Sequence, residues 1–249
     1  MTKKYGLSFI SDEQLYTHVK ETIKKYRFKI NLKQFNKNLI DPVKLTFDAK
    51  VYGKTIEEII ETESIRQMDK SNTNHIGYFH QNIFKFLGDN WIVPEQGYDV
   101  INEVDKIYVE MKNKHNTMNS SSAQKTYIKM QHKILRDDSA TCYLVEVIAK
   151  NSQDIAWTVS IDGEQLSNKN IRRISIDKFY EMVTGEKNSF KTLCEILPTV
   201  INDVIAENNM GKIKNSVFPE LKKISPNLIK SLYLLSFKKY EGFTNLNIK

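Results

Sequence analysis

The sequence predicts an α/β fold in which helices flank a β-sheet, and three observations carry this prediction. Apolar residues recur at helical spacing up to residue 87, apart from a mixed stretch at residues 28–53, and at strand spacing between residues 91 and 112. The chain has 249 residues, of which 40% are hydrophobic, enough for the buried core of one large domain. No internal repeat and no linker rich in Pro, Gly or Ser interrupts it. We therefore expect a single domain over residues 1–249.

The first part of the chain is expected to be mainly helical. Ser11 and Gln14 form a capping box, which predicts a helix that ends near Arg27. Further along, apolar residues at helical spacing predict two helices on either side of a polar break at residues 71–74. The second of these closes at Gly88, because glycine is the usual residue just beyond a helix C-terminus.

The middle of the chain is expected to form the sheet. Short apolar runs predict strands at 91–93 and 98–101, and a turn at Asn102-Glu103 leads into a third strand at 106–112. The later elements are a helix at 121–136, two buried strands at 143–149 and 155–161, a turn at 162–163, and helices at about 175–184, 189–208 and 226–240.

The net charge of +7 is concentrated in three stretches. Residues 1–50 carry 11 basic and 5 acidic side chains, residues 106–136 carry 7 and 1, and residues 212–249 carry 8 and 2. Segregation of this kind indicates a polyanion partner. The chain also has 32 lysines against 5 arginines, which an AT-rich genome explains equally well. The charge alone leaves both interpretations open.

Several classes of protein are excluded by composition. No apolar run approaches the roughly 20 residues of a membrane helix, and the Met-Thr-Lys-Lys start lacks the apolar segment of a secretory signal. Two cysteines are too few for a structural zinc site or a disulfide framework, so a cytoplasmic protein is expected. Nine scattered glycines form no phosphate loop, which argues against an ATPase and against a methyltransferase.

The strand at 106–112 carries the residues with the clearest chemistry. Asp99 is followed, after ten residues, by Glu110 and Lys112. Since side chains alternate along a strand, Glu110 and Lys112 lie on one face, and Asp99 on the neighbouring strand can converge on them. Two carboxylates, with the carbonyl oxygen of Met111, form a hard oxygen site of the kind that Mg²⁺ takes. Lys112 can assist the attacking water in phosphodiester hydrolysis. An exposed cross-strand ion pair would show the same triplet.

The helix before these strands adds Gln81, at the end of the run Gly77-Tyr78-Phe79-His80-Gln81. The segment resembles the Gly-x-x-x-Glu helix that precedes the first core strand in some nucleases, whose helix acid sometimes contacts metal or water. The resemblance implies that Gln81 can orient a water molecule, although it brings no charge. A glutamine on a helix surface is the other interpretation.

These elements resemble the core of the PD-(D/E)xK nucleases, with Tyr98 at the position that is usually Pro. The run from Lys112 to Ser120 is more specific, and it resembles type II restriction endonucleases that cut GGNCC sites. The pair Arg172-Arg173 lies in the region of this similarity. The similarity extends from about residue 56 to residue 204.

The resemblance implies a mixed central sheet flanked by helices, with basic helical extensions at residues 1–50 and 212–249. It implies a Mg²⁺-dependent endonuclease that cuts both strands of DNA and leaves 5′-phosphate and 3′-hydroxyl ends. It also implies a homodimer, because the site is a near-palindrome. A cognate DNA methyltransferase is expected as a genetic partner rather than a physical one.

Candidate DNA contacts are polar or basic residues near the catalytic strand and on the helix that follows, together with the paired arginines. They are Asn113, Lys114, His115, Asn116, Asn119, Lys125, Lys129, Arg136, Arg172 and Arg173. Lys125, Lys129 and Lys133 recur every four residues, as a phosphate track or as a solvated stripe. A paired arginine can equally grip a neighbouring carboxylate.

Two other functions remain open at this point. A structure-specific nuclease, such as a junction resolvase, would use the same catalytic core. A non-catalytic DNA-binding protein would use only the basic surfaces, and two converging carboxylates near phosphate speak against it because they repel DNA.

Overall fold

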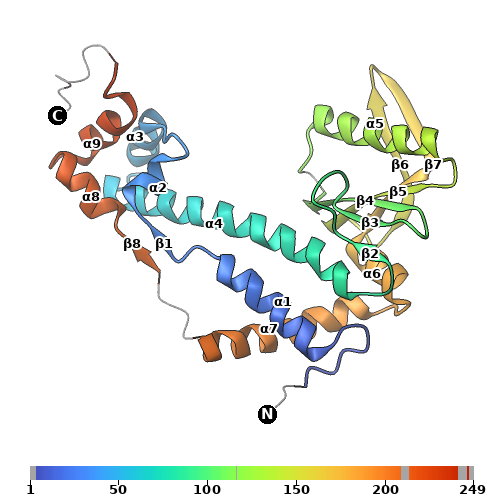
Figure 1. The fold of residues 1–249 in the computed structure, drawn as a ribbon. Coiled ribbons are helices and arrows are strands. Elements are labelled where there is room, and N and C mark those ends of the chain that lie inside the picture. The colour runs from blue at the N-terminus through green and yellow to red at the C-terminus, as the bar shows by residue number, and fades with distance from the viewer. Residues whose placement is uncertain (1–3, 116, 209–212, 241–245, 247–249) are drawn as a thin grey trace. The chain divides into compact units, whose positions relative to one another are not determined.

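The computed structural model describes residues 4–115, 117–208, 213–240 and 246. Its contacts divide the chain into two compact units, Met1–Lys24 with Ile76–Asn208 and Lys25–His75 with Asn209–Lys249 (Figure 1). The expected single domain with a core at about 56–204 stays a prediction. By their contacts, residues 56–75 belong to the second unit.

Within the described residues, the first unit contains one six-stranded sheet in the order β2-β3-β4-β5-β7-β6. Its strands are β2 (Trp91–Ile92), β3 (Val100–Asn102), β4 (Ile107–Lys114), β5 (Thr141–Ile148), β6 (Asp154–Ile161) and β7 (Glu164–Ser175). The pairs β2–β3, β3–β4 and β6–β7 are antiparallel, while β4–β5 and β5–β7 are parallel. The prediction of a mixed sheet flanked by helices is confirmed.

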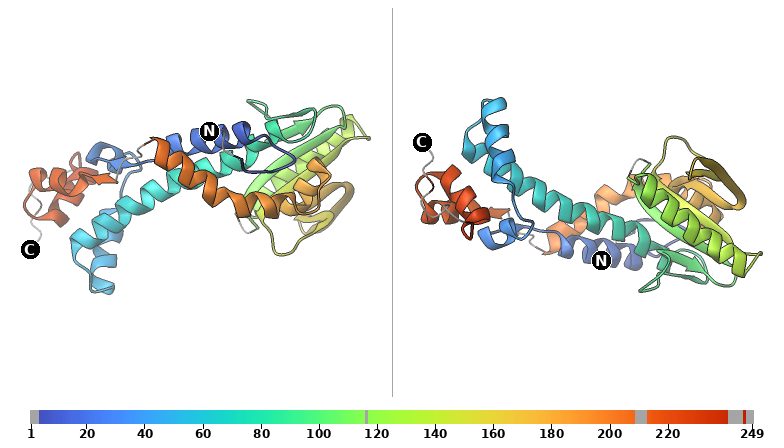
Figure 2. Two further views of the ribbon diagram at one scale, coloured as in Figure 1. Left: turned by 90° about the horizontal axis from the view of Figure 1, so that it is seen from below. Right: turned by 90° about the horizontal axis from the view of Figure 1, so that it is seen from above.

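The helices of the first unit cover both faces of this sheet. They are α1 (Asp12–Lys25), the end of α4 (Ile56–Asn82), the 3-10 helix η1 (Ile83–Phe86), α5 (Ser120–Arg136), α6 (Ile176–Thr184) and α7 (Ser189–Asn208). On one face, Val109 and Met111 of β4 pack in a core shared with α6 and α7. On the other face, Tyr108 packs with Tyr127 and Met130 of α5. Figure 2 shows the sheet between α5 and the α6–α7 pair.

The alternation predicted for β4 is therefore the feature that positions the site. It places Glu110 and Lys112 on the α5 face, while apolar residues fill the other side. Asn119 starts α5 as its N-cap, because its side chain accepts a hydrogen bond from the backbone N–H of Ser122 at 2.9 Å. The capping box of α1 is confirmed as well, with two 3.2 Å hydrogen bonds between Ser11 and Gln14.

The second unit contains the remaining elements. They are β1 (Lys29–Ile30), α2 (Leu32–Asn36), α3 (Pro42–Val51), the start of α4, β8 (Lys214–Asn215), α8 (Val217–Ile224) and α9 (Leu228–Phe237). β1 and β8 pair in parallel, so residues 29–30 and 214–215, far apart in the sequence, lie side by side. Phe35, Leu221 and Leu232 are fully buried in a shared apolar core. Of the described helices, none combines the length and apolar character needed to cross a membrane.

Two sequence-based predictions of elements are wrong, and one strand of the sheet was not predicted. The expected break at residues 71–74 does not occur, because α4 continues through it and Asn72 accepts a hydrogen bond from the backbone N–H of Arg27 at 3.0 Å. The strand β7 was not predicted, because its first half is polar and exposed. The strand β6 was expected to be buried, but it is the edge of the sheet and most of its residues are exposed.

Candidate active site

Asp99 stands where β3 begins, and its carboxylate is fixed on the backbone of β4. The register places Val100 opposite Val109. The backbone N–H of Asp99 donates to the carbonyl of Val109 at 2.8 Å. In return, the backbone N–H of Met111 donates to Asp99 Oδ2 at 2.7 Å. Asp99 is therefore held beside Glu110 by one backbone hydrogen bond and by one from the β4 backbone to its side chain.

Glu110 is the buried member of the group, with 9% of its surface exposed. Its carboxylate forms an ion pair with Lys112 Nζ at 3.7 Å. It also accepts a hydrogen bond from Lys129 Nζ, which reaches it from α5. Lys129 further donates to the carbonyl of Gly97 at 2.7 Å and lies 4.2 Å from the ring centroid of Tyr98. The structure thus brings together Asp99, Glu110, Lys112 and Lys129.

The electrostatics of Asp99 reflect this crowding. Burial raises the pKa of Asp99, and the charge of Glu110 raises it further. The hydrogen bond from the Met111 N–H and the charges of Lys112 and Lys129 act in the opposite direction. Two carboxylates in a partly desolvated place stay ionised only with positive charge nearby, and the lysines supply that charge.

A divalent cation fits this donor set. Among the described residues, no group of three or more His, Cys, Asp or Glu side chains converges on one point, so a cage built wholly of protein ligands is not found there. Two carboxylates, with a backbone carbonyl such as that of Met111, are the few protein ligands with which Mg²⁺ binds while it keeps several waters. Burial raises the pKa of Asp99, with a further contribution from Glu110, and a bound cation would act in the opposite direction, as the two lysines do.

Gln81 reaches the same site from α4. It lines an open pocket of about 310 Å³ together with Lys85, Gln96, Tyr98 and Asp99. The structure therefore places Gln81 and Asp99 on one surface. The proposed part of Gln81 in orienting water stays a prediction.

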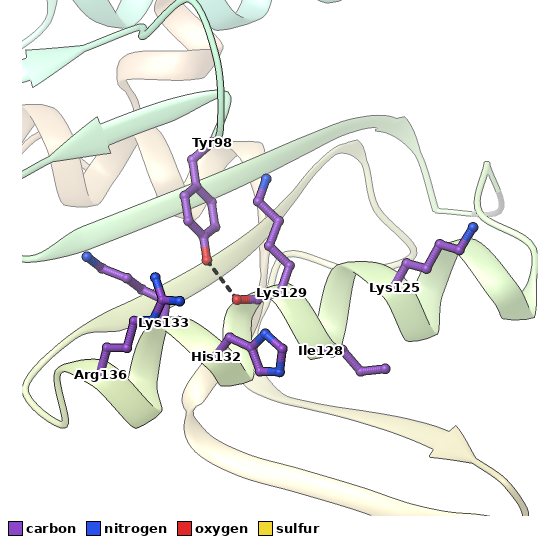
Figure 3. Close-up of a pocket in the computed structure, with 7 residues that line it drawn as sticks. All are labelled: Tyr98, Lys125, Ile128, Lys129, His132, Lys133 and Arg136. Atoms are coloured by element: carbon purple, nitrogen blue, oxygen red, sulfur yellow. Dashed lines mark hydrogen bonds between the residues drawn. The ribbon is translucent and has the colours of Figure 1, made fainter.

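The lysines of α5 form a basic groove that begins at Tyr98. The groove encloses about 490 Å³ (Figure 3). Its lining residues are Tyr98, Lys125, Ile128, Lys129, His132, Lys133 and Arg136. Lys133 Nζ lies 3.9 Å from the ring centroid of Tyr108, so aromatic rings of β4 and of the segment before β3 support two of the lysines. The expected lysine series does lie on one face of its helix.

The candidate DNA contacts between residues 113 and 119 differ in their surroundings. The side chain of Asn113 lies beside Gly77 of α4, where an added Cβ would be in ordinary van der Waals contact with it at 3.6 Å. Lys114 is exposed, whereas Asn119 caps α5. His115 turns back to the sheet, where its Nδ1 lies 3.0 Å from Glu146 Oε2. Asn116 lies outside the described residues.

The two adjacent arginines point to opposite faces of the sheet. Arg172 is opposite Tyr143 and forms an ion pair with Asp154 at 2.6 Å. Arg173 is opposite Leu144 and forms an ion pair with Glu146 at 2.8 Å. Leu144 faces α5, so Arg173 shares the face of Glu110 and Arg172 does not. Both arginines form an ion pair with a carboxylate, which is the alternative to a DNA contact that the sequence left open.

Glu146 lies beside the candidate site and was not singled out from the sequence. It lies in β5 directly opposite Lys112 and is buried. The available signal was a lone acid inside the apolar run Tyr143–Ile148. The contact of Lys129 with Glu110 was missed as well, because helix periodicity shows which residues share a face but not what the face packs against.

Comparison with known proteins gives consistent matches. The family described as Eco47II restriction endonuclease matches residues 7–206. The type II restriction enzyme Sau96I of Staphylococcus aureus is 33% identical over 224 residues, which cover 85% of each protein. The type II restriction enzyme Eco47II of Escherichia coli is 32% identical over 216 residues, which cover 81% of this chain and 89% of the relative.

Proposed function

The chain belongs to the Eco47II restriction endonuclease family, and from this membership we propose that it is a Mg²⁺-dependent type II enzyme that cuts double-stranded DNA at GGNCC. The observation that carries the catalytic part is the convergence of Asp99, Glu110 and Lys112 at the junction of β3 and β4. The resemblance of the Lys112–Ser120 run to GGNCC-cutting enzymes supports GGNCC as the DNA sequence that is recognised.

The reaction is hydrolysis of one phosphodiester bond in each strand. The oxygen of a water molecule forms a bond to phosphorus, the bond from phosphorus to the 3′ oxygen breaks, and that oxygen takes up a proton. The products are a 5′-phosphate and a 3′-hydroxyl. Restriction endonucleases generally use a divalent cation, and here Asp99, Glu110 and the Met111 carbonyl would hold Mg²⁺, whose charge offsets the negative charge developing on the phosphate.

The side chains of the site divide the remaining work. Lys112 holds the attacking water, helps to remove its proton and stabilises the charged transition state. Gln81 orients water from the side of α4. Lys125, Lys129 and Arg136 hold the DNA backbone along the groove of α5.

The partners follow from the substrate. A near-palindromic site is matched by a two-fold symmetric dimer, in which each subunit cuts one strand. A methyltransferase of the same specificity protects the DNA of the host cell, and it acts on the DNA rather than on this protein.

Digestion of a sequenced plasmid tests the proposal. We expect discrete fragments with Mg²⁺, none with EDTA, and fragment ends at GGNCC in run-off sequencing. Glu110→Ala and Lys112→Ala should each abolish cleavage and leave binding in Ca²⁺ largely intact. Glu103→Ala, in the exposed turn between β3 and β4, is the control and should cut like the wild type.

Three results would contradict parts of the proposal. Cutting at the wild-type rate by either active-site variant would remove that residue from the mechanism. Fixed cleavage positions outside GGNCC would overturn the assigned sequence. Tight binding without cleavage in Mg²⁺ or Mn²⁺ would identify a DNA-binding protein instead of a nuclease.

A further inference from the structure

Glu146 is a charged residue in a place that otherwise favours apolar side chains. It is fully buried in β5, where Cys142 and Leu144 precede it on the same face. Burying a carboxylate costs free energy unless it is paired. Even a buried ion pair often contributes less to stability than well-packed apolar residues of the same volume. The packing of β5 against α5 therefore gives no reason for an acid at this position.

The contacts of Glu146 point to its use. Oε1 lies 2.8 Å from a terminal guanidinium nitrogen of Arg173, and Oε2 lies 3.0 Å from His115 Nδ1. The partners come from two different elements, since Arg173 belongs to β7 and His115 follows β4. One buried carboxylate thus contacts two nitrogen-bearing side chains, His115 at hydrogen-bond distance and Arg173 in an ion pair.

The position of this cluster relates it to the catalytic residues. In the register of the sheet, Glu146 lies directly opposite Lys112 on the same face. The side chains of His115 and Arg173 are 19% and 21% exposed, so both reach the surface, whereas that of Glu146 is 1% exposed. Arg173 is also supported by Trp157, whose ring centroid lies 5.9 Å from the guanidinium carbon. The cluster has a buried anchor and two nitrogen donors at the surface next to Lys112.

We propose that Glu146 is a positioning residue that holds Arg173 and His115 against a DNA phosphate next to the one that is cut. The inference deepens the proposed function and rests on it. A guanidinium held by a carboxylate keeps further N–H groups for phosphate oxygens, and its fixed orientation lowers the entropy lost on binding. Glu146 itself does not touch the DNA.

Affinity for duplex DNA in Ca²⁺ tests this role without relying on cleavage. Glu146→Gln should weaken binding about tenfold, and by the same factor for a GGNCC duplex and a scrambled duplex, because a phosphate carries no sequence information. Glu63→Gln is the matched control. It breaks another carboxylate–arginine pair, with Arg66 at 2.6 Å in the second unit, and should bind like the wild type.

A double-mutant cycle separates positioning from a purely structural role. Because Glu146 acts through Arg173 and also holds His115, the double variant Glu146→Gln/Arg173→Ala should lose more affinity than Arg173→Ala alone but less than the sum of the two single losses. The apolar pair Glu146→Met/Arg173→Met leaves no unpaired charge and guards against a variant that fails to fold. It should unfold at or above the wild-type temperature and still bind DNA about tenfold more weakly.

Several outcomes would overturn the inference. Wild-type affinity in the folded Met/Met variant would make the cluster a structural feature only, and a loss confined to the GGNCC duplex would indicate a base contact instead of a phosphate contact. Additive losses in the cycle would show that Glu146 does not act through Arg173. Cleavage by Glu110→Ala is a separate result, because it would contradict the proposed active site and leave the binding measurements valid.

Discussion

Glu110 is held between two lysines that reach it from different elements. Lys112 lies two residues away on the same strand, whereas Lys129 extends from α5. Their charges offset those of Asp99 and Glu110 and favour the ionised form of Asp99. Lys129 therefore contacts the same carboxylate to which a divalent cation would bind, so the lysine and the cation compete for Glu110.

This competition predicts that Lys129→Met binds divalent cations more tightly. Removal of the lysine leaves Glu110 with one counter-charge fewer, so the affinity for Mg²⁺ or Ca²⁺ without DNA should rise severalfold. Isothermal titration calorimetry measures it. Lys125→Met, one turn earlier on the same groove, removes an equal charge and should leave the cation affinity unchanged. Equal affinities for Lys129→Met and the wild type would show that Lys129 does not compete.

At the scale of elements, the join between η1 and β2 depends on one glycine. Gly88 has a φ of +63°, and a Cβ added there would lie 2.8 Å from the carbonyl oxygen of Val183 in α6. The chain can therefore turn toward Trp91 only because this residue has no side chain. Gly185, at the end of α6, has a φ of +74° but no atom near its absent Cβ.

The contrast predicts different costs for the same substitution. Gly185→Ala should lower the free energy of unfolding by about 1 kcal/mol, the strain of a left-handed backbone alone. Gly88→Ala should lower the free energy of unfolding by roughly 2–4 kcal/mol, because α6 must also move. Urea unfolding measures both values. A similar decrease in the free energy of unfolding for the two variants would mean that α6 can move aside without a loss of stability.

Helices and strands were predictable where the spacing of apolar residues in the sequence matches the side of the element that is buried in the fold. The alternation of β4 gave its two faces, and with them the site, because one face is apolar and the other is not. The continuity of α4 was not predictable, because Asn72 is held by Arg27, which is distant in sequence. The faces of Arg172 and Arg173 depend on the register of β7 with β5, which the sequence does not encode locally. The same limit hid the pairing of Glu146.

At the scale of the whole molecule, the net charge of +7 has a measurable consequence. Each phosphate that a lysine neutralises releases counterions, so the logarithm of DNA affinity falls by about 0.9 per contact for each tenfold rise in salt concentration. The groove of α5 places Lys125 and Lys133 on one such surface.

The double variant Lys125→Gln/Lys133→Gln should therefore lower this salt slope by about two. Affinity for a duplex in Ca²⁺, measured between low and physiological salt, gives the slope. Lys106→Gln/Lys178→Gln removes the same charge from lysines already paired with Asp137 and Glu181, so its slope should match the wild type. An unchanged slope in the first variant would make the groove lysines a solvated stripe.

The hydrogen bond from the Met111 amide to Asp99 gives the site a built-in reporter. This backbone N–H donates to the carboxylate at 2.7 Å, where a backbone carbonyl would usually accept. Its proton chemical shift and its exchange with solvent therefore depend on the charge of Asp99. A single peak in an NMR spectrum of the labelled protein would follow cation binding and protonation at the active site, without DNA and without any added probe.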